Sequence, residues 1–150
     1  MTEPARLLET VTELEVPFHH VDALRIVWHG HYPKYFEAGG MALLRRLDLD
    51  GADLVERRFH LVVIESTCRH AFPLRYGERL RVCTWIDDYR RRLTLRHEIT
   101  NLSQGRRAAR GHTRLAVLDD GDRLRLEIPP EIRARIEAAA TGLPLPRTDG

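Results

Sequence analysis

The residues best suited to chemistry lie in one stretch, residues 14–47, which combines a carboxylate with the expected start of a helix. Asp22 follows a predicted strand, and Pro33 stands where a helix would begin, a position that tolerates the fixed φ and missing N–H of proline. Backbone N–H groups at a helix N-terminus lack intrahelical acceptors and can polarise a carbonyl group, which a nearby carboxylate can attack directly or through water. We therefore place the chemistry where the Asp22 loop meets this helix.

The elements that position this junction follow from the spacing of apolar residues. Before the loop, one strand face is predicted by the alternation of Leu14, Val16, Phe18 and His20. After the loop, from Tyr32 onwards, a buried helical stripe is predicted by Phe36, Gly39, Leu43 and Leu47. The residues ahead of the strand, 4–13, favour one or two helical turns.

Downstream of the helix the pattern changes to long β-type segments. A second short helix or turn is expected through Arg57, and strands are predicted over residues 59–72, 80–89, 93–102 and 107–118. Ser103-Gln104-Gly105 predicts a hairpin loop, and a C-terminal helix is expected over Glu131–Ala140. Residues 1–140 would then form a single domain, and residues 141–150 a flexible tail.

The order of these elements predicts the fold class. Short connections favour antiparallel neighbours, and one helix cannot cover both faces of a sheet. The economical arrangement is an α+β protein in which a curved antiparallel sheet wraps around one long central helix, which is the hotdog fold. Gly39 and Gly40 cost helix stability relative to alanine, but they fit a helix whose backbone lies close against the sheet.

The composition is that of an ordinary globular protein, with 43% apolar residues, 31% charged residues and a net charge of +2. The 24 basic residues include one lysine, Lys34, and this arginine excess fits either phosphate contacts or genomic base composition. Cys68 and Cys83 have neither disulfide nor metal-site spacing and are expected to be buried free thiols. No signal peptide or bilayer-spanning apolar stretch is visible, so we expect a cytoplasmic protein without a membrane partner.

Residues 22–32, DALRIVWHGHY, carry a family resemblance. An aspartate, a short loop, two apolar residues, an aromatic residue, a histidine and a tyrosine at the helix start follow one another in this segment. That pattern resembles the signature of the 4-hydroxybenzoyl-CoA thioesterase family of hotdog proteins. The segments 36–38, 89–97 and 120–125 are also similar to that family, so the resemblance covers roughly residues 14–135.

The resemblance implies a set of site residues. Asp22 would be the catalytic carboxylate, as nucleophile or general base, and His29 would lie where a backbone N–H group polarises the thioester carbonyl. Gly30 and Tyr32 would bind substrate at the helix start. The residues themselves leave alternatives open, because Asp22 also suits capping of its own turn, His29 a helix start without a role, and Tyr32 packing.

Two further segments bear on the substrate. Arg90, Arg91 and Arg92 would bind the phosphates of coenzyme A at a subunit edge, with a solvated turn as the alternative. Leu24 and Arg25 occupy the place where the family has glycine, so the loop is expected to reshape the acyl pocket or to hold the aspartate differently.

The remaining polar residues support weaker hypotheses. Glu37 is expected to pair with a loop or a neighbouring subunit, while Ser66 and Thr67 either hydrogen-bond a nucleophilic water or have no role. A metal is suggested by the histidine cluster, but no metal site is expected because its spacing matches no zinc motif. The cluster comprises His19, His20, His29 and His31.

The resemblance, together with these residues, implies a thioester hydrolase that releases a free acid and a thiol. The substrate would be an acyl-CoA or aroyl-CoA, or an acyl carrier protein thioester, and no cofactor is expected beyond the coenzyme A of the substrate. A thiolate leaving group needs little protonation, and no Gly-x-Ser-x-Gly elbow is present, so a carboxylate suffices. A homodimer or homotetramer is expected, because a lone sheet leaves edges and a face uncovered. The resemblance implies that the site lies at the dimer interface.

Three alternative functions remain open. A hotdog dehydratase would keep the fold and change the reaction, and a non-catalytic acyl thioester binding module would keep the pocket without turnover. A nucleic-acid binder is suggested by the arginines alone. No motif supports it, so no nucleic-acid partner is expected.

Overall fold

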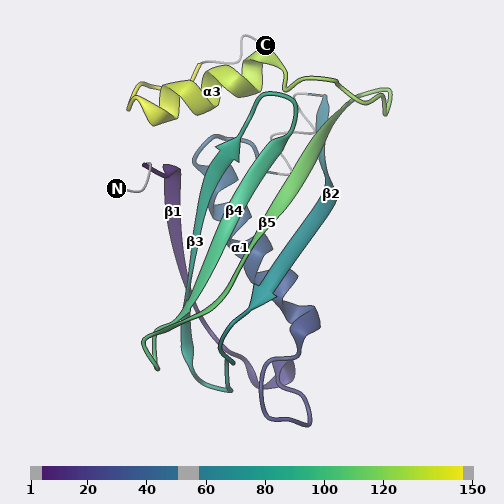
Figure 1. Ribbon diagram of the computed structural model, residues 1–150. Coiled ribbons are helices and arrows are strands. Elements are labelled where there is room, and N and C mark those ends of the chain that lie inside the picture. Colours follow the sequence, from purple (N-terminus) through teal and green to yellow (C-terminus); the bar gives the residue numbers. More distant parts are fainter. Residues whose placement is uncertain (1–4, 51–57, 147–150) are drawn as a thin grey trace.

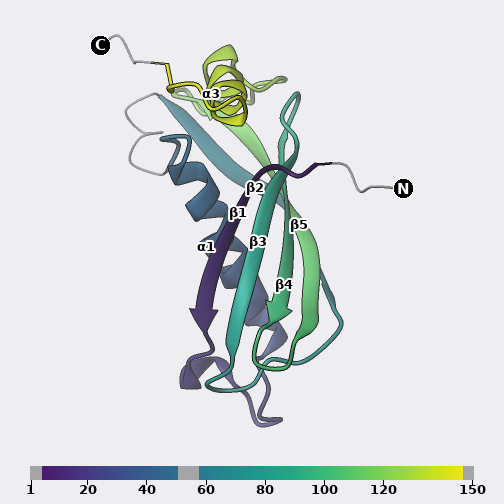
Figure 2. The same cartoon turned by 90° about the vertical axis from the view of Figure 1, so that its left-hand side faces the viewer.

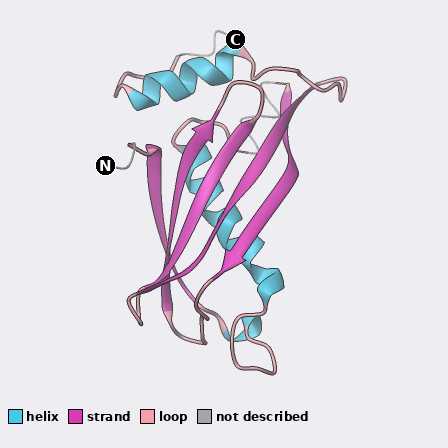
Figure 3. Ribbon diagram, viewed as in Figure 1, coloured by secondary structure: helices cyan, strands magenta, loops and turns pink. Residues whose placement is uncertain are grey.

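The computed structural model describes residues 5–50 and 58–146 of the 150-residue chain. One antiparallel sheet has the strand order β1-β3-β4-β5-β2 (Figures 1 and 3). Two 3₁₀ turns, Phe18–His20 and His29–His31, lie between β1 and α1. The strands and helices are β1 (Leu7–Glu15), α1 (Tyr32–Arg45), β2 (Phe59–His70), β3 (Arg79–Asp88), β4 (Leu93–Asn101), β5 (Arg106–Asp119) and α3 (Pro130–Ala140).

The sheet curves around α1, which lies along its concave side (Figures 1 and 2). The helix stripe is buried as predicted, and so are the inward residues of the central strands, because the two-residue period of a strand places alternate side chains on one face. The buried residues are Phe36, Gly39, Leu43 and Leu47 of the stripe, Leu80, Val82, Thr84 and Ile86 of β3, and Leu93, Leu95, His97 and Ile99 of β4. The predicted hotdog arrangement is confirmed.

The two helix glycines lie where the sheet comes closest to α1. A Cβ atom on Gly39 would meet the hydroxyl of Thr84 and lie 2.8 Å from Cγ1 of Val82. A Cβ atom on Gly40 would lie 3.3 Å from Cδ1 of Leu95. The predicted close approach of helix and sheet is therefore confirmed, with the tighter contact at Gly39.

The N-terminal prediction is wrong in two respects. Residues 7–15 form strand β1 and not helical turns, and Phe18–His20 is a 3₁₀ turn and not a strand end. Residues 10–15 pair antiparallel with residues 79–84 of β3, and this long-range pairing overrides a weak local helical pattern. Pro17 ends the strand because it has no N–H group to donate to the ladder.

Helix α3 lies across one end of the sheet (Figures 1 and 2). Its Ile132 and Ile136 are buried in the same core cluster as Leu47. Buried Arg135 donates hydrogen bonds to the Leu47 carbonyl at 3.1 Å and to the Pro146 carbonyl at 3.0 Å. Pro146, within the expected tail, therefore contacts α3.

Part of the sequence-based expectation falls on residues that are not described. The second helix or turn through Arg57 and the last four residues, 147–150, lie outside the described ranges. Within those ranges, no helix is both long and apolar enough to cross a membrane.

Candidate active site

Asp22 lies in a tight loop between the first 3₁₀ turn and α1. Its backbone N–H donates to the Ile26 carbonyl at 3.0 Å, and an isolated bridge joins Val21 to Val27. One carboxylate oxygen, Oδ1, accepts the Leu24 N–H at 2.8 Å, so the side chain does cap its own turn. Within the described residues the other oxygen, Oδ2, has no protein hydrogen-bond partner, and it remains available to a substrate or water.

Arg25 occupies the strained position of this loop. Its φ is +62°, in the left-handed region that glycine adopts without steric cost and other residues rarely enter. A glycine, which the resemblance implies for this loop in the family, would adopt this conformation without strain. Here the loop keeps the conformation with an arginine, and the neighbouring Leu24 side chain is 74% exposed.

The start of α1 presents two backbone N–H groups without acceptors. The Trp28 N–H donates to the His20 carbonyl at 3.0 Å, and the His31 N–H donates to the Trp28 carbonyl at 2.9 Å. The N–H groups of His29 and Gly30, which lie between them, have no recorded acceptor in the described part of the chain. The Trp28 indole covers Gly30 so closely that a Cβ atom there would overlap the ring. Such free N–H groups can stabilise an oxyanion.

A hollow of about 400 Å³ brings several predicted residues together. Asp22, His29 and Tyr32 line it, with His70 from the end of β2. The Tyr32 and His70 rings make an edge contact with 4.4 Å between their centroids. Burial raises the pKa of Tyr32 to about 12, so its phenol stays protonated, while partial burial and the nearby His29 lower the pKa of His70. Gly30 is not among the residues that line this hollow.

A second cavity, of about 380 Å³, lies between α1 and the sheet. Its wall is mostly apolar, with Phe36 and Met41 from the helix, and it includes two polar residues considered above, Glu37 and Ser66. Neither side chain has a hydrogen-bond or ion-pair partner among the described residues, so the expected pairing of Glu37 is not observed there. The cavity has the character of a site for an acyl group.

Sequence reasoning missed His97, which lines this second cavity. The residue is 1% exposed, and desolvation with a smaller contribution from His112 lowers its pKa to about 3. The available signal was its place on the inward face of a strand among apolar residues. That position predicted burial but not the polar contacts that the imidazole makes with two other strands.

The histidines near the loop pack against one another. The His20 and His31 rings stack with centroids 4.4 Å apart and an interplanar angle of 14°. Nδ1 of His20 lies 2.8 Å from the Tyr35 hydroxyl. Among the described residues, no three His, Cys, Asp or Glu side chains are grouped in a way that could hold a metal ion.

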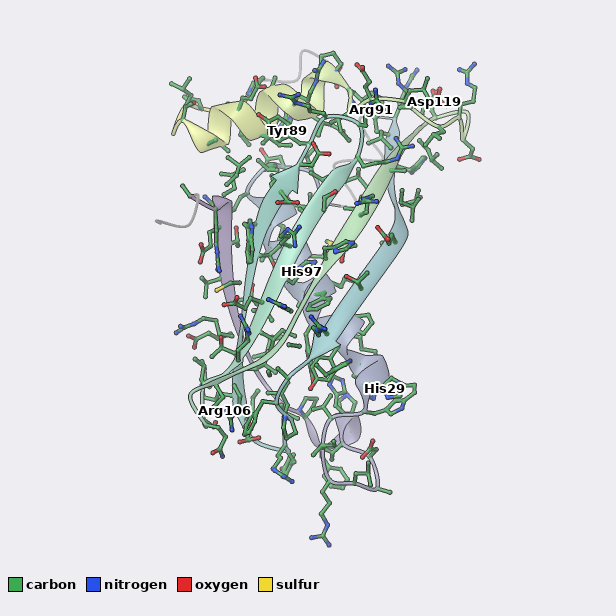
Figure 4. All side chains as sticks on the ribbon, in the orientation of Figure 1. His29, Tyr89, Arg91, His97, Arg106 and Asp119 are labelled. Atoms are coloured by element: carbon green, nitrogen blue, oxygen red, sulfur yellow. The ribbon has the colours of Figure 1, made fainter. Side chains whose placement is uncertain are left out.

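The three consecutive arginines lie far from Asp22 within one chain. They form the turn between β3 and β4, where the Arg90 N–H donates to Oδ1 of Asp88 and the Arg90 carbonyl accepts the Ile128 N–H. Figure 4 shows Arg91 near α3 and His29 towards the opposite end of the molecule. The ten residues of β3 separate the ends by roughly 30 Å. Contact of Arg90, Arg91 and Arg92 with a substrate at Asp22 would therefore have to involve a second subunit.

A curved sheet around one helix, with a carboxylate at the helix start, defines a protein of the hotdog class. The chain matches the family described as the thioesterase-like superfamily over residues 16–136. Because this match covers most of the sequence, the chain belongs to that superfamily. The predicted family is confirmed, and the prediction of a thioester hydrolase is confirmed at the level of the family.

The individual proteins that the chain resembles share about a third of its residues or fewer over the matched segments, as three examples show. YneP of Bacillus subtilis, whose name assigns it provisionally to the acyl-CoA thioesterases, is 34% identical over 77 residues, which are 51% of this chain and 56% of YneP. The hypothetical protein TT1821 of Thermus thermophilus is 26% identical, with a TM-score of 0.77 and coverage of 85% of this chain and 97% of that one. A DHNA-CoA thioesterase of Staphylococcus aureus is 24% identical, with a TM-score of 0.73 and coverage of 79% and 80%, a likeness of fold.

Proposed function

We propose that this protein hydrolyses an acyl-CoA or aroyl-CoA thioester to the free acid and coenzyme A, with Asp22 as general base or nucleophile. The observation that carries the proposal is the shared hollow in which Asp22 lies with His29, at a helix start whose His29 and Gly30 N–H groups lack acceptors. Membership of the thioesterase-like superfamily and the likeness to YneP support thioester chemistry and an acyl-CoA substrate.

The reaction follows from the free atoms of this site. As general base, Oδ2 of Asp22 takes a proton from water, and the resulting hydroxide attacks the thioester carbon. The carbonyl oxygen becomes an oxyanion beside the His29 and Gly30 N–H groups. The tetrahedral intermediate then expels the thiolate of coenzyme A, which takes up the proton from Asp22. As nucleophile, the carboxylate would instead displace the thiolate and form a mixed anhydride, which water hydrolyses.

We also propose that the active form is a homodimer or homotetramer. Strand β2 is one edge of the sheet, and its Val63 and Ile64 are 61% and 52% exposed. An uncovered edge with apolar side chains is suited to pairing with a second copy. The Arg90, Arg91 and Arg92 turn of that second copy would be the source of any phosphate contacts near Asp22. A cytoplasmic location stays a prediction.

Release of free thiol from a panel of acyl-CoA and aroyl-CoA thioesters tests the proposal, with Glu15→Gln, at an exposed carboxylate on β1, as the matched control. Turnover by Asp22→Asn is expected to fall at least about a hundredfold, a typical loss for a general base. Glu15→Gln is expected to stay within a few-fold of the wild type. A large loss in Glu37→Gln with an active Asp22→Asn would move the chemistry to the cavity along α1.

The same panel separates the alternative functions. Hydrolysis of acyl carrier protein thioesters, without turnover of coenzyme A thioesters, would identify the carrier protein as substrate. Tight binding without turnover of either would indicate a binding module. Elimination of water from a 3-hydroxyacyl-CoA would indicate a dehydratase.

A further inference from the structure

A hollow of about 550 Å³ on the outer face of the sheet is lined by five arginines and a single glutamate. On β4, Arg96 and Glu98 flank His97, whose ring stacks on Phe36 of α1. The two-residue period of a strand therefore directs Arg96 and Glu98 away from the helix. Figure 2 shows α1 on the other side of the sheet. The charged residues that line the hollow are Arg6, Arg69, Arg96, Arg107, Arg110 and Glu98.

The register of the sheet places two of these arginines directly opposite each other. Arg69 on β2 pairs with Arg110 on β5, and Arg110 pairs in turn with Glu98 on β4. Directly opposite residues of antiparallel strands lie on one face, with Cβ atoms about 5 Å apart. Both arginines are exposed. Like charges in such a pair repel each other, so an anion bound between the two guanidinium groups would relieve a repulsion.

The carboxylates around the hollow are already paired with other arginines. The ion pairs are Glu98–Arg6 at 3.6 Å, Glu98–Arg107 at 3.8 Å, Asp87–Arg96 at 3.2 Å and Glu65–Arg114 at 3.0 Å. Within the part of the chain that the structure describes, neither Arg69 nor Arg110 has a hydrogen-bond or ion-pair partner. Their donors are therefore available to a ligand.

The excess of guanidinium groups favours a small anionic ligand. In a two-fold contact between copies of the chain, the same positive face would meet itself, and its charges would repel. A guanidinium group matches phosphate through two parallel N–H···O bonds. Two such groups on neighbouring strands can contact adjacent phosphates of one molecule, and the volume of the hollow is that of a small-molecule site.

We propose that Arg69 and Arg110 form a binding site for the diphosphate group of a nucleotide on the face of the sheet opposite α1. Each guanidinium donates to phosphate oxygens, and Arg96 and Arg107 add positive potential around them. The inference goes beyond the proposed hydrolysis, since neither Arg69 nor Arg110 takes part in the reaction at Asp22. A free nucleotide and coenzyme A both carry a diphosphate, and the test distinguishes these two sources.

The test is calorimetric titration of inorganic pyrophosphate, ADP and coenzyme A into the wild type and the double variant Arg69→Gln/Arg110→Gln. Pyrophosphate is expected to bind the double variant at least about tenfold more weakly, because charge-assisted hydrogen bonds are lost. The control Arg58→Gln/Arg125→Gln removes two exposed arginines outside the hollow and should keep the affinity of the wild type. Arg69→Lys/Arg110→Lys keeps both charges without the planar fork and should recover only part of the affinity.

Thermal unfolding gives a second measurement that does not depend on turnover. Pyrophosphate should raise the Tm of the wild type but not that of Arg69→Gln/Arg110→Gln, because a ligand stabilises only a protein that binds it. Without ligand the double variant should be at least as stable as the wild type, since both positions are exposed and a repulsion is removed. Of ADP and coenzyme A, the ligand whose affinity falls more in the double variant is the source of the diphosphate.

Pyrophosphate binding that is equal in wild type and double variant overturns the inference, as does its absence from both. Full affinity in Arg69→Lys/Arg110→Lys would also overturn it, because a diffuse positive field would then suffice. Binding of an acyl carrier protein through these arginines, without binding of any of the small anions, would overturn it as well and assign the face to an acidic protein. Inactivity towards thioesters would leave these binding measurements unaffected, so failure of the proposed hydrolysis is distinguishable.

Discussion

Replacement of His97 by glutamine is expected to reduce the loss of stability that acid causes. The imidazole is 1% exposed, and its pKa falls from an ordinary value of 6.5 to about 3, mainly because burial penalises the charged ring. The nearby His112 lowers the pKa further. Nδ1 and Nε2 of His97 lie within hydrogen-bond distance of the Thr84 and Thr113 hydroxyls. Glutamine keeps one donor and one acceptor near these hydroxyls but is not protonated between pH 3 and pH 7.

Proton linkage gives the sign and the size of the change in unfolding free energy with pH. Between pH 6.5 and 3 the unfolded chain holds a proton on His97 that the folded chain lacks, so the free energy of unfolding falls as pH falls. The slope approaches about 1.4 kcal/mol per pH unit. Between pH 7 and pH 5 the loss from this residue amounts to about 2 kcal/mol, and below about pH 3 no further loss arises.

The assay is urea unfolding of wild type and His97→Gln at pH 7, 6 and 5, at one protein concentration because subunit association would contribute to stability. The wild type is expected to lose about 2 kcal/mol more than the variant between the highest and lowest pH. The pKa values of His20, His31 and His70 are also lowered, but these residues are present in both proteins. An equal loss of unfolding free energy in the two proteins between pH 7 and pH 5 would refute the conclusion that the His97 ring is buried and neutral.

Two further predictions concern the Asp22 loop and the sheet edge. Arg25→Gly should raise the free energy of unfolding by about 1 kcal/mol, because glycine adopts the φ of +62° without steric cost. Arg25→Ala should not raise it. Thermal unfolding measures both variants, and an unchanged or lower Tm in Arg25→Gly would contradict strain at this loop position. Ile64→Lys on the β2 edge should lower the mass observed in sedimentation velocity. The control is Leu126→Lys, which should leave the mass unchanged, because Leu126 is 77% exposed and lies away from that edge. Equal masses for Ile64→Lys and wild type would argue against association through β2.

The sequence by itself determined the elements whose pattern is strong and local. The helical stripe that begins with Phe36 predicted α1, and two-residue alternation predicted the strands from β2 to β5, because burial of one face imposes these periods. The run from Asp22 to Tyr32 indicated the loop and helix start, where the structure places Asp22 and His29 in one hollow. Strand β1 was missed because its pairing with β3 is long-range and its own pattern is weak.

The tertiary structure alone decided which distant residues meet. Thr84, His97 and Thr113 come from three strands, and nothing in their spacing along the chain relates them, because the register of the sheet sets their contacts. The antiparallel strand order separates the Arg91 turn from His29, which shares a hollow with Asp22, because antiparallel strands carry successive turns to opposite ends. Local periodicity specifies an element and its buried face, whereas the pairing of elements places particular side chains together.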